Sequence, residues 1–521
     1  MFYYFSRTKP FAHRRIILYL PLILVETFMA TTYILYRNGP WMFPYQKDPL
    51  TLLFVSACLV LFAAGYAITA ERGRKHGVTI CFPQKSPVLP LVIICALLSL
   101  PYCYARTGSL YPPIWQLSDL SDAYIRAFLN AQNHILLRFV LFFTDLIKYL
   151  LMITLYMNWT TIKPWLRRTG FILCAWIYSV NLCVGRNRAV MFVSILISML
   201  YLVRLVRGYH KSARMGLLKM TAFALVIILA GPVYFGLTMQ ARGVQMRSNA
   251  VNLEITRREA LDYELARDSA LREMVVDTFG FVAPTMVEEA ECDSGDRKIT
   301  IVPGEVSQNI VERYEAAAPK AEELHPLYVM PFAYAYLNIE DPVFARLPSI
   351  LSYIYAVGTS YVSHGYHGLA IALRIPFEST FGVGQVMIAH ETVSSLLGID
   401  IYARSYTGKV NNSGFPLSLH WGTAFIQFAS DFSFPGASLF MGVLGIMFAL
   451  FWMEALHGNI LSQLLFVVMT INLLFITSWW QAGLSVGDFI LSYGSAALWL
   501  IMKVYAIIQI RRSIIKKIAE L

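Results

Sequence analysis

Two pairs of arginines at the ends of apolar runs are the first residues whose type and spacing suggest chemistry. Arg186 and Arg188 separate two such runs, and Arg242 and Arg247 follow a third. A guanidinium binds phosphate oxygens through a planar fork of hydrogen bonds and keeps its charge. The pairs therefore suggest a phosphate or diphosphate site at a membrane surface. Snorkelling of the side chains to lipid headgroups is the equally open alternative.

A second polar group lies in the segment 361–378, which contains His364, Tyr366, His367 and Arg374. Histidines three residues apart share one face of a helix. A zinc site would require a third ligand, and the chain has no HExxH pattern. We therefore expect no metal and no cofactor.

A third group ends at Asp431, which follows His420 and Trp421 and lies among apolar residues just before a predicted span. Desolvation raises the pKa of such a carboxyl unless a cation pairs with it. A carboxylate of this kind can act as a general base toward a sugar hydroxyl. The alternative is an ion pair that fixes the loop, and the sequence leaves both interpretations open.

The elements that position these residues follow from composition. Hydrophobic residues make up 57% of the 521 residues and charged residues 14%, whereas soluble domains have about 25% charged residues. A helix needs roughly 20 apolar residues to cross a bilayer. We therefore predict an all-α polytopic membrane protein with about ten transmembrane helices. The predicted spans are 16–37, 50–70, 88–104, 135–158, 169–184, 189–206, 216–238, 436–455, 459–479 and 484–508.

Lysines and arginines concentrate in alternate short loops, which predicts that both termini are cytoplasmic. Residues 1–238 would form an N-terminal bundle of about seven spans, and 436–521 a C-terminal group of about three. The segment 239–435 would be periplasmic, with helices that lie on the membrane surface or re-enter it. The net charge of +11 does not indicate nucleic-acid binding, because no basic and aromatic stripe lies outside these loops.

Ionisable residues inside the predicted spans are functional candidates. Glu26, Asp145 with Lys148, and Asp488 are of this kind. They are the best support for a transporter, but Asp145 and Lys148 are three residues apart and could neutralise each other.

Three of these stretches, in this order, resemble the O-antigen polymerase family of membrane glycosyltransferases. The resemblance lies in His364-Gly-Tyr-His-Gly-Leu-Ala-Ile-Ala-Leu373 with Phe381-Gly-Val-Gly384, then Trp421-Gly-Thr-Ala-Phe, then Asp431-Phe-Ser-Phe-Pro-Gly436. Relatives have a Gly-Tyr-Tyr-Gly-Leu helix at the first motif, and here His367 replaces the second tyrosine. The similarity covers roughly 75 residues, and elsewhere it is one of architecture.

The resemblance implies a metal-independent glycosyltransferase of the C type in a bacterial inner membrane. It would polymerise undecaprenyl-diphosphate-linked oligosaccharide units at the periplasmic face. A chain-length regulator and a flippase of the same pathway, together with membrane lipid, would be its partners. In the implied site, the diphosphate binds to Arg186, Arg188, Arg242, Arg247 and, as a weaker candidate, Arg374. The catalytic residue is Asp431, His364 or His420. The sugar contacts are Tyr366, His367 and Trp421.

Two alternatives remain at this stage. An O-antigen ligase shares the architecture and the lipid-linked donor and differs mainly in its acceptor. A lipid-linked oligosaccharide flippase or other transporter belongs to another class, but transporters usually have small outer loops and paired broken helices. The long segment 239–435 is less typical of a transporter.

Overall fold

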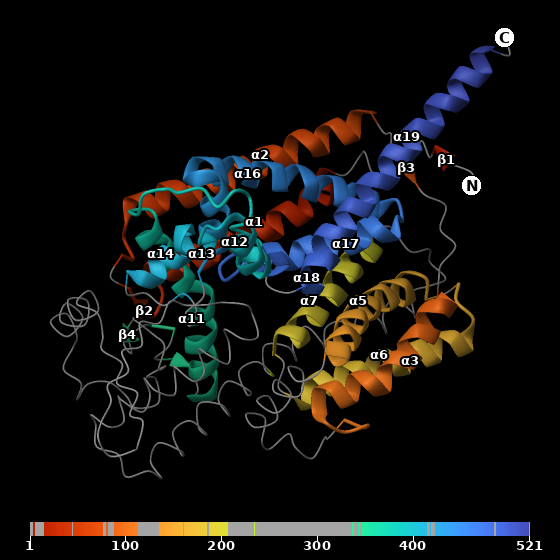
Figure 1. Cartoon of the computed structure of the whole chain (residues 1–521), viewed down its shortest axis with the longest axis horizontal. Coiled ribbons are helices and arrows are strands. Elements are labelled where there is room, and N and C mark those ends of the chain that lie inside the picture. The colour runs from red at the N-terminus through yellow and green to blue at the C-terminus, as the bar shows by residue number, and fades with distance from the viewer. Residues whose placement is uncertain are drawn as a thin grey trace.

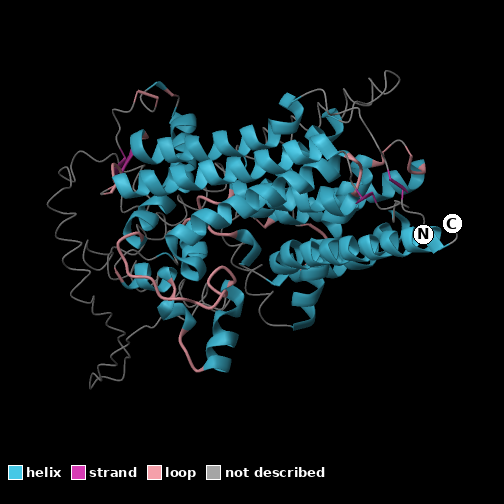
Figure 2. Cartoon of the chain, turned by 90° about the horizontal axis from the view of Figure 1, so that it is seen from above, coloured by secondary structure: helices cyan, strands magenta, loops and turns pink. Residues whose placement is uncertain are grey.

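The computed structural model describes a chain built almost entirely of helices, with a few two-residue strands (Figures 1 and 2). All structural statements concern these described residues. They are 4–5, 15–43, 45–76, 80–81, 88–112, 135–159, 161–184, 187–206, 234, 336–337, 342–343, 346–347, 349–413, 417, 422–483 and 486–519.

Among the described residues, the first half of the chain contains six long helices. They are α1 (Arg15–Asn38), α2 (Pro49–His76), α3 (Val88–Thr107), α5 (Ile135–Met157), α6 (Pro164–Cys183) and α7 (Asn187–Val206). Three of the two-residue strands belong to this half, β1 (Tyr4–Phe5), β2 (Trp41–Met42) and β3 (Ile80–Cys81).

The second half begins with the strand β4 (Tyr336–Leu337) and the helix α11 (Ser349–Ala372). Short helices follow, namely η5 (Met387–Ala389), α12 (His390–Leu397), α13 (Ile401–Arg404) and α14 (Tyr406–Asn412). The last elements are α16 (Ala424–Leu456), α17 (Ile460–Leu474), η6 (Gln481–Gly483), α18 (Val486–Phe489), the π-helical turn η7 (Ile490–Gly494) and α19 (Ser495–Ala519).

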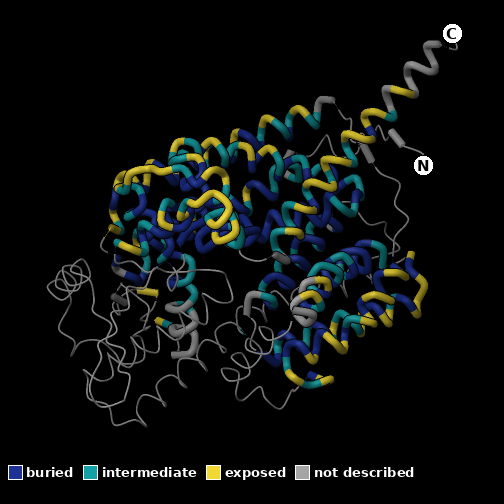
Figure 3. Tube along the Cα trace, in the orientation of Figure 1, coloured by how far each residue is buried: buried dark blue, intermediate teal, exposed yellow. Residues whose placement is uncertain are grey.

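Within the described residues, six helical segments are long and apolar enough to cross a membrane. Figure 3 shows exposed residues along α2 and α19. Large apolar side chains are among them: Leu53 on α2 is 70% exposed and Ile501 on α19 is 64% exposed. Large exposed apolar surfaces of this kind suit lipid rather than water. The chain is therefore a multi-pass α-helical membrane protein. The six segments are Ile17–Asn38, Pro49–Arg74, Val88–Thr107, Phe139–Met157, Ala424–Leu456 and Ile490–Gln509.

Nine of the ten predicted spans overlap a described helix, and the seventh, 216–238, lies almost wholly outside the described residues. Two of the overlapping helices contain only shorter apolar stretches, Ala189–Arg204 and Ile460–Leu474. The eighth predicted span, 436–455, coincides with the second part of α16. Two helical stretches meet within α16 at a kink, because the backbone of Ser433 is not helical (φ 60°, ψ 171°). The stretch before the kink, from Ala424 onward, lies outside the predicted span.

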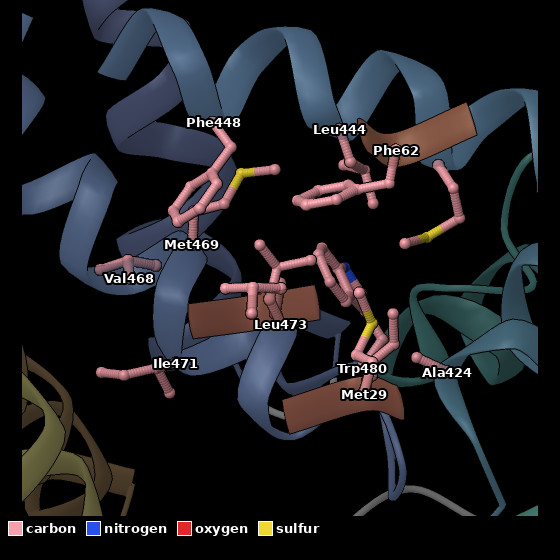
Figure 4. Packing of buried hydrophobic residues seen from close by; sticks show 14 of the residues in the cluster. Met29, Phe62, Ala424, Leu444, Phe448, Val468, Met469, Ile471, Leu473 and Trp480 are labelled. Carbon is pink, nitrogen blue, oxygen red and sulfur yellow. The ribbon is translucent and has the colours of Figure 1, made fainter. Parts of the chain in front are cut away.

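The main core forms where α2 and α16 pack side by side. Figure 4 shows Phe62 of α2 with Leu444 and Phe448 of α16, and the rings of Phe62 and Phe448 have centroids 6.1 Å apart. Glycines permit this close approach: a Cβ on Gly65 would lie 2.1 Å from the carbonyl oxygen of Gly442. Small residues commonly bring membrane helices together in this way.

A second packing unit is formed by α3, α5 and α6, which have their own buried clusters and lie beside the main core (Figure 1). Asp145 of α5 forms ion pairs with Lys148 of the same helix and, at 3.3 Å, with Arg106 of α3. The hydroxyl of Tyr102 lies 3.3 Å from a carboxylate oxygen of Asp145 and 3.1 Å from the side-chain oxygen of Asn181 of α6. The expected Asp145–Lys148 pair is present, and these neighbouring polar groups connect it to α3 and α6.

Two small strand pairs mark opposite ends of the molecule (Figures 1 and 2). At one end β1 pairs with β3, near the C-terminal end of α19. At the other end β2 pairs antiparallel with β4, with Trp41 opposite Leu337, close to α11, α13 and α14. The two ends of the described chain thus lie on the same side, away from α11.

The C-terminal helix α19 is attached to the core through Glu454, which is 5% exposed. Lys503 of α19 pairs with its carboxylate at 2.5 Å, and Trp499 donates an indole N–H to it at 2.8 Å. Ser462 of α17 donates to the same carboxylate at 2.7 Å. One carboxylate therefore holds α16, α17 and α19 together at the end where the chain terminates.

We predict that Gly65→Ala lowers the free energy of unfolding by about 1–3 kcal/mol, the usual cost of overpacking. The added methyl meets backbone rather than a flexible side chain. Thermal unfolding of the purified protein in detergent measures the effect. Gly442→Ala is the matched control, because its Cβ would meet Leu61 at an ordinary 3.4 Å. Equal unfolding temperatures for the two variants would contradict the close approach.

Candidate functional site

The candidate site is built around the loop that follows α11, residues 373–386, and the start of α16. Asp431 of α16 is 9% exposed. Its Oδ1 accepts hydrogen bonds from Thr380 Oγ1 at 2.5 Å and from the backbone N–H of Gly384 at 2.7 Å. Its Oδ2 accepts from the N–H of Gln385 at 3.1 Å. The carboxylate therefore fixes the loop on the helix.

Glycine is required at position 384 by this packing. A Cβ there would lie 2.5 Å from Thr380 Oγ1 and 2.7 Å from the Cβ of Ser430. Gly382 has φ +84°, a conformation that other residues adopt at a cost. The two glycines of the Phe381-Gly-Val-Gly384 stretch thus serve the turn and its contact with α16. They form no nucleotide-binding motif.

Backbone strain is concentrated at this junction. Among the described residues, only two that are not glycine have a positive φ: Phe381 at 56° and Ser433 at 60°. Phe381 lies in the fixed loop, and Ser433 lies two residues beyond Asp431. Such conformations cost of order 1–3 kcal/mol each and cluster at functional sites. Their coincidence marks this junction as the best candidate site in the described structure.

Arg374, predicted as a weaker diphosphate ligand, lies at the edge of this site with a carboxylate partner. Its Nη2 is 2.7 Å from Oδ1 of Asp48, whose side chain is 4% exposed. Asp48 also caps α2 by accepting the N–H of Thr51 at 2.9 Å. Burial raises the pKa of Asp48, but the hydrogen bonds from Thr51 and Arg374 outweigh it, so the pKa is lowered. The guanidinium stacks 4.7 Å from the ring centroid of Tyr45.

Two further cations, Arg404 and Lys409, were missed by the sequence reasoning. Both reach Glu378: the Lys409 Nζ is 3.1 Å and the Arg404 Nε 3.9 Å from its carboxylate oxygens. Lys409 also donates to the carbonyl oxygen of Pro376 at 2.9 Å. Neither cation follows a span or forms an Arg pair, so no local pattern distinguishes them. Only the fold brings them to the loop that Asp431 fixes.

The predicted sugar contacts of α11 lie in the interior. Tyr366 is fully buried, and its hydroxyl is 3.1 Å from Thr32 Oγ1 of α1. His367 is 2% exposed, and its ring stacks on Tyr45 with centroids 5.6 Å apart. Burial, together with the neighbouring His364, lowers the pKa of His367 to about 3. Both side chains therefore pack α11 against α1 and the connection between α1 and α2, and a direct sugar contact would require this packing to open.

Several predicted site residues lie outside the description. Arg186, Arg242, Arg247, His420 and Trp421 are not among the described residues. Arg188 lies in α7, but its side chain is not described either. The structure describes the other predicted site residues: His364, Tyr366 and His367 lie in α11, Arg374 follows α11, and Asp431 lies in α16.

Nothing in the described residues forms a group of three or more His, Cys, Asp or Glu that could hold a metal ion. The polar groups of the site are cations, one exposed carboxylate and backbone amides. Such a set binds anionic or hydroxyl-bearing ligands directly.

The fold and site define a class of protein: a multi-pass α-helical membrane protein with a fixed, strained loop at one end of its bundle. Comparisons with protein-family models, with curated proteins and with solved structures found no match. Its function must therefore be argued from the chemistry of the site.

We predict that Asp431→Asn releases the loop, because the new amide group faces hydrogen-bond donors and leaves at least one of them buried without an acceptor. Hydrogen exchange of the amides of Gly384 and Gln385 should become faster, because the free energy of local opening should fall by about 1–3 kcal/mol. Asp400→Asn is the matched control. Asp400 caps α13 by accepting from Ala403 at 2.9 Å, so its replacement should affect α13 alone. Unchanged exchange at Gly384 in Asp431→Asn would show that the carboxylate does not fix the loop.

Proposed function

We propose that the protein polymerises undecaprenyl-diphosphate-linked oligosaccharide units into O-antigen or a similar surface polysaccharide. The observation that supports this best is the contact between two stretches that resemble the polymerase family. Gly384 of Phe381-Gly-Val-Gly384 donates directly to Asp431 of Asp431-Phe-Ser-Phe-Pro-Gly436. These two stretches are distant in sequence, and they resemble stretches that occur in the same order in one family. They meet at one junction with a strained backbone.

In this proposal the membrane is a bacterial inner membrane that the chain crosses about ten times, and both termini are cytoplasmic. The segment 239–435 and the candidate site then face the periplasm. Two observations agree with this orientation. The described ends of the chain lie together at one end of the molecule, and α11, α13 and α14 lie at the other (Figure 1). Lysines and arginines concentrate in the loops assigned to the cytoplasm.

The reaction moves a sugar from one lipid diphosphate to a hydroxyl of a second lipid-linked unit. The bond between the donor sugar and the diphosphate breaks, and the departing diphosphate gains negative charge. Fixed guanidinium groups stabilise that charge in a site from which water is excluded. Arg186, Arg188, Arg242 and Arg247 have this role in the proposal. Arg374, already paired with Asp48, has the smaller part.

The acceptor hydroxyl must lose a proton to a general base. Asp431 already accepts three hydrogen bonds, which favours a positioning role for it over the role of base. His364 is better placed chemically. Its Nδ1 is 2.6 Å from the carbonyl oxygen of Ser360, which can only accept a hydrogen bond. The proton is therefore assigned to Nδ1, and Nε2 becomes the basic nitrogen. His420 is the other candidate for the base.

Deletion of the gene should collapse the ladder of surface glycan to core plus a single repeat unit, because ligation and export continue without polymerisation. The measurement is a gel of lipopolysaccharide extracted from the deletion strain, with the complemented strain as control. Loss of every repeat with accumulation of lipid-linked polymer would indicate a ligase instead. Single lipid-linked units on the cytoplasmic side would indicate a transporter, and an unchanged ladder would exclude O-antigen as the product.

Replacement of Arg186 or Arg242 by Ala should lower polymerisation at least about tenfold, since a hydrogen bond to a charged group contributes about 1.5–3 kcal/mol. Lys should restore little, because an ammonium cannot form the bidentate fork. Ladder length after complementation with each variant at matched protein level measures the effect. Arg72→Ala, at the end of α2 that is assigned to the cytoplasmic side, is the control. A full-length ladder with both Arg186→Ala and Arg242→Ala would rule out the proposed diphosphate site.

A further inference from the structure

Phe381 combines exposure with strain. The residue is 56% exposed, and its backbone φ is 56°, a strained value for a residue other than glycine. The loop around it is held by the hydrogen bonds from Thr380, Gly384 and Gln385 to Asp431. A ring that is more than half exposed recovers little hydrophobic stabilisation to offset the backbone cost of about 1–3 kcal/mol. Packing within the protein therefore does not explain why the ring is held at this position.

The surroundings of the ring are polar and charged. The guanidinium carbon of Arg404 lies 5.2 Å from the centroid of the Phe381 ring. The carboxylate of Glu378, whose side chain is 51% exposed, lies between Arg404 and Lys409. The Nε of Arg404 faces the Glu378 carboxylate at 3.9 Å, and the Arg404 side chain is 33% exposed. An apolar face, a carboxylate and a fork of donors thus meet on one exposed surface.

We propose that Phe381, Glu378 and Arg404 form a sugar-binding subsite. A pyranose ring has an apolar face of C–H groups and hydroxyls around its edge. The aromatic face of Phe381 packs against the C–H face, while Glu378 accepts and Arg404 donates hydrogen bonds to the hydroxyls. This inference rests on the proposed function and deepens it. The ligand is a sugar of the lipid-linked repeat unit, bound outside the diphosphate site.

A lipid tail fits this surface less well than a sugar. Insertion of Phe381 into hydrocarbon would carry Arg404, Lys409 and Glu378 with it, and desolvation of charged groups costs several kcal/mol each. A sugar instead supplies hydroxyls to the same charged groups. The charge pattern around the ring therefore favours a saccharide.

The test uses the full chain in lipid nanodiscs and, as probe, the repeat-unit oligosaccharide released by mild acid from the host's own surface glycan. Saturation-transfer NMR measures affinity and identifies the sugar protons that touch the protein. Phe381→Ala should weaken binding about tenfold and abolish transfer to the C–H protons, whereas Phe381→Tyr should retain both. Glu378→Gln should weaken binding with the C–H contacts kept. Phe377→Ala is the matched control, because Phe377 is an exposed phenylalanine (42%) of the same loop.

Wild-type affinity and transfer in Phe381→Ala would overturn the subsite. It would also be overturned if brominated lipids quenched the tryptophan fluorescence that Phe381→Trp introduces, since the ring would then lie in the bilayer. These outcomes are separate from the fate of the proposed function. A polymerase without this subsite would still lose its glycan ladder on gene deletion, and a sugar-binding protein of another activity would still show the loss of transfer in Phe381→Ala.

Discussion

The hydrogen bonds of Asp431 are the interaction on which the candidate site depends. A single buried carboxylate accepts hydrogen bonds from two backbone N–H groups and one hydroxyl of the loop. Thr380 adds hydrogen bonds to the carbonyl oxygen of Ser430 on the same helix. Charge-assisted hydrogen bonds such as those to Asp431 are about twice as strong as neutral ones. They are strong enough to maintain an unfavourable backbone conformation at Phe381, and the kink at Ser433 places the same carboxylate at the end of a membrane helix.

A rigid base lies beneath this junction. The close contact between α2 and α16 through Gly65 fixes the helix that bears Asp431. Asp48 caps the N-terminal end of α2 and pairs with Arg374, which follows the C-terminal end of α11. One ion pair therefore joins these two helix ends. Tyr45 then connects Arg374 to His367 by stacking on both. The loop of the site is thus held by Asp431 of α16 and, through Arg374, by Asp48 and Tyr45.

The sequence predicts the membrane helices and the site each in part. Nine of the ten predicted spans overlap a described helix, and six described segments are long and apolar enough to cross a membrane. Hydropathy identifies these six because a bilayer requires long apolar helices whatever the rest of the fold. The pattern also singled out Asp431 and the Phe381-Gly-Val-Gly384 stretch. It left open whether Asp431 acts as a base or fixes the loop, since the donors that surround it come from a segment distant in the chain. A predicted ion pair at this position is in fact a set of hydrogen bonds from neutral groups.

The residues that the sequence could not rank are those whose role depends on a partner far along the chain. From the sequence, Arg374 is a cation available to a ligand, but in the structure it forms an ion pair with Asp48. Arg404 and Lys409 read as ordinary surface residues, although they share one carboxylate beside a strained aromatic ring. Asp145 shows the converse, because its charge is taken up by Lys148 and Arg106 inside the bundle. A charged residue whose ion-pair partner is buried stabilises the fold, whereas the exposed carboxylate of Glu378 can still accept a hydrogen bond from a ligand. The exposure of the ion-pair partner, rather than the presence of a charge, therefore distinguishes residues of the candidate site from residues that only support the fold.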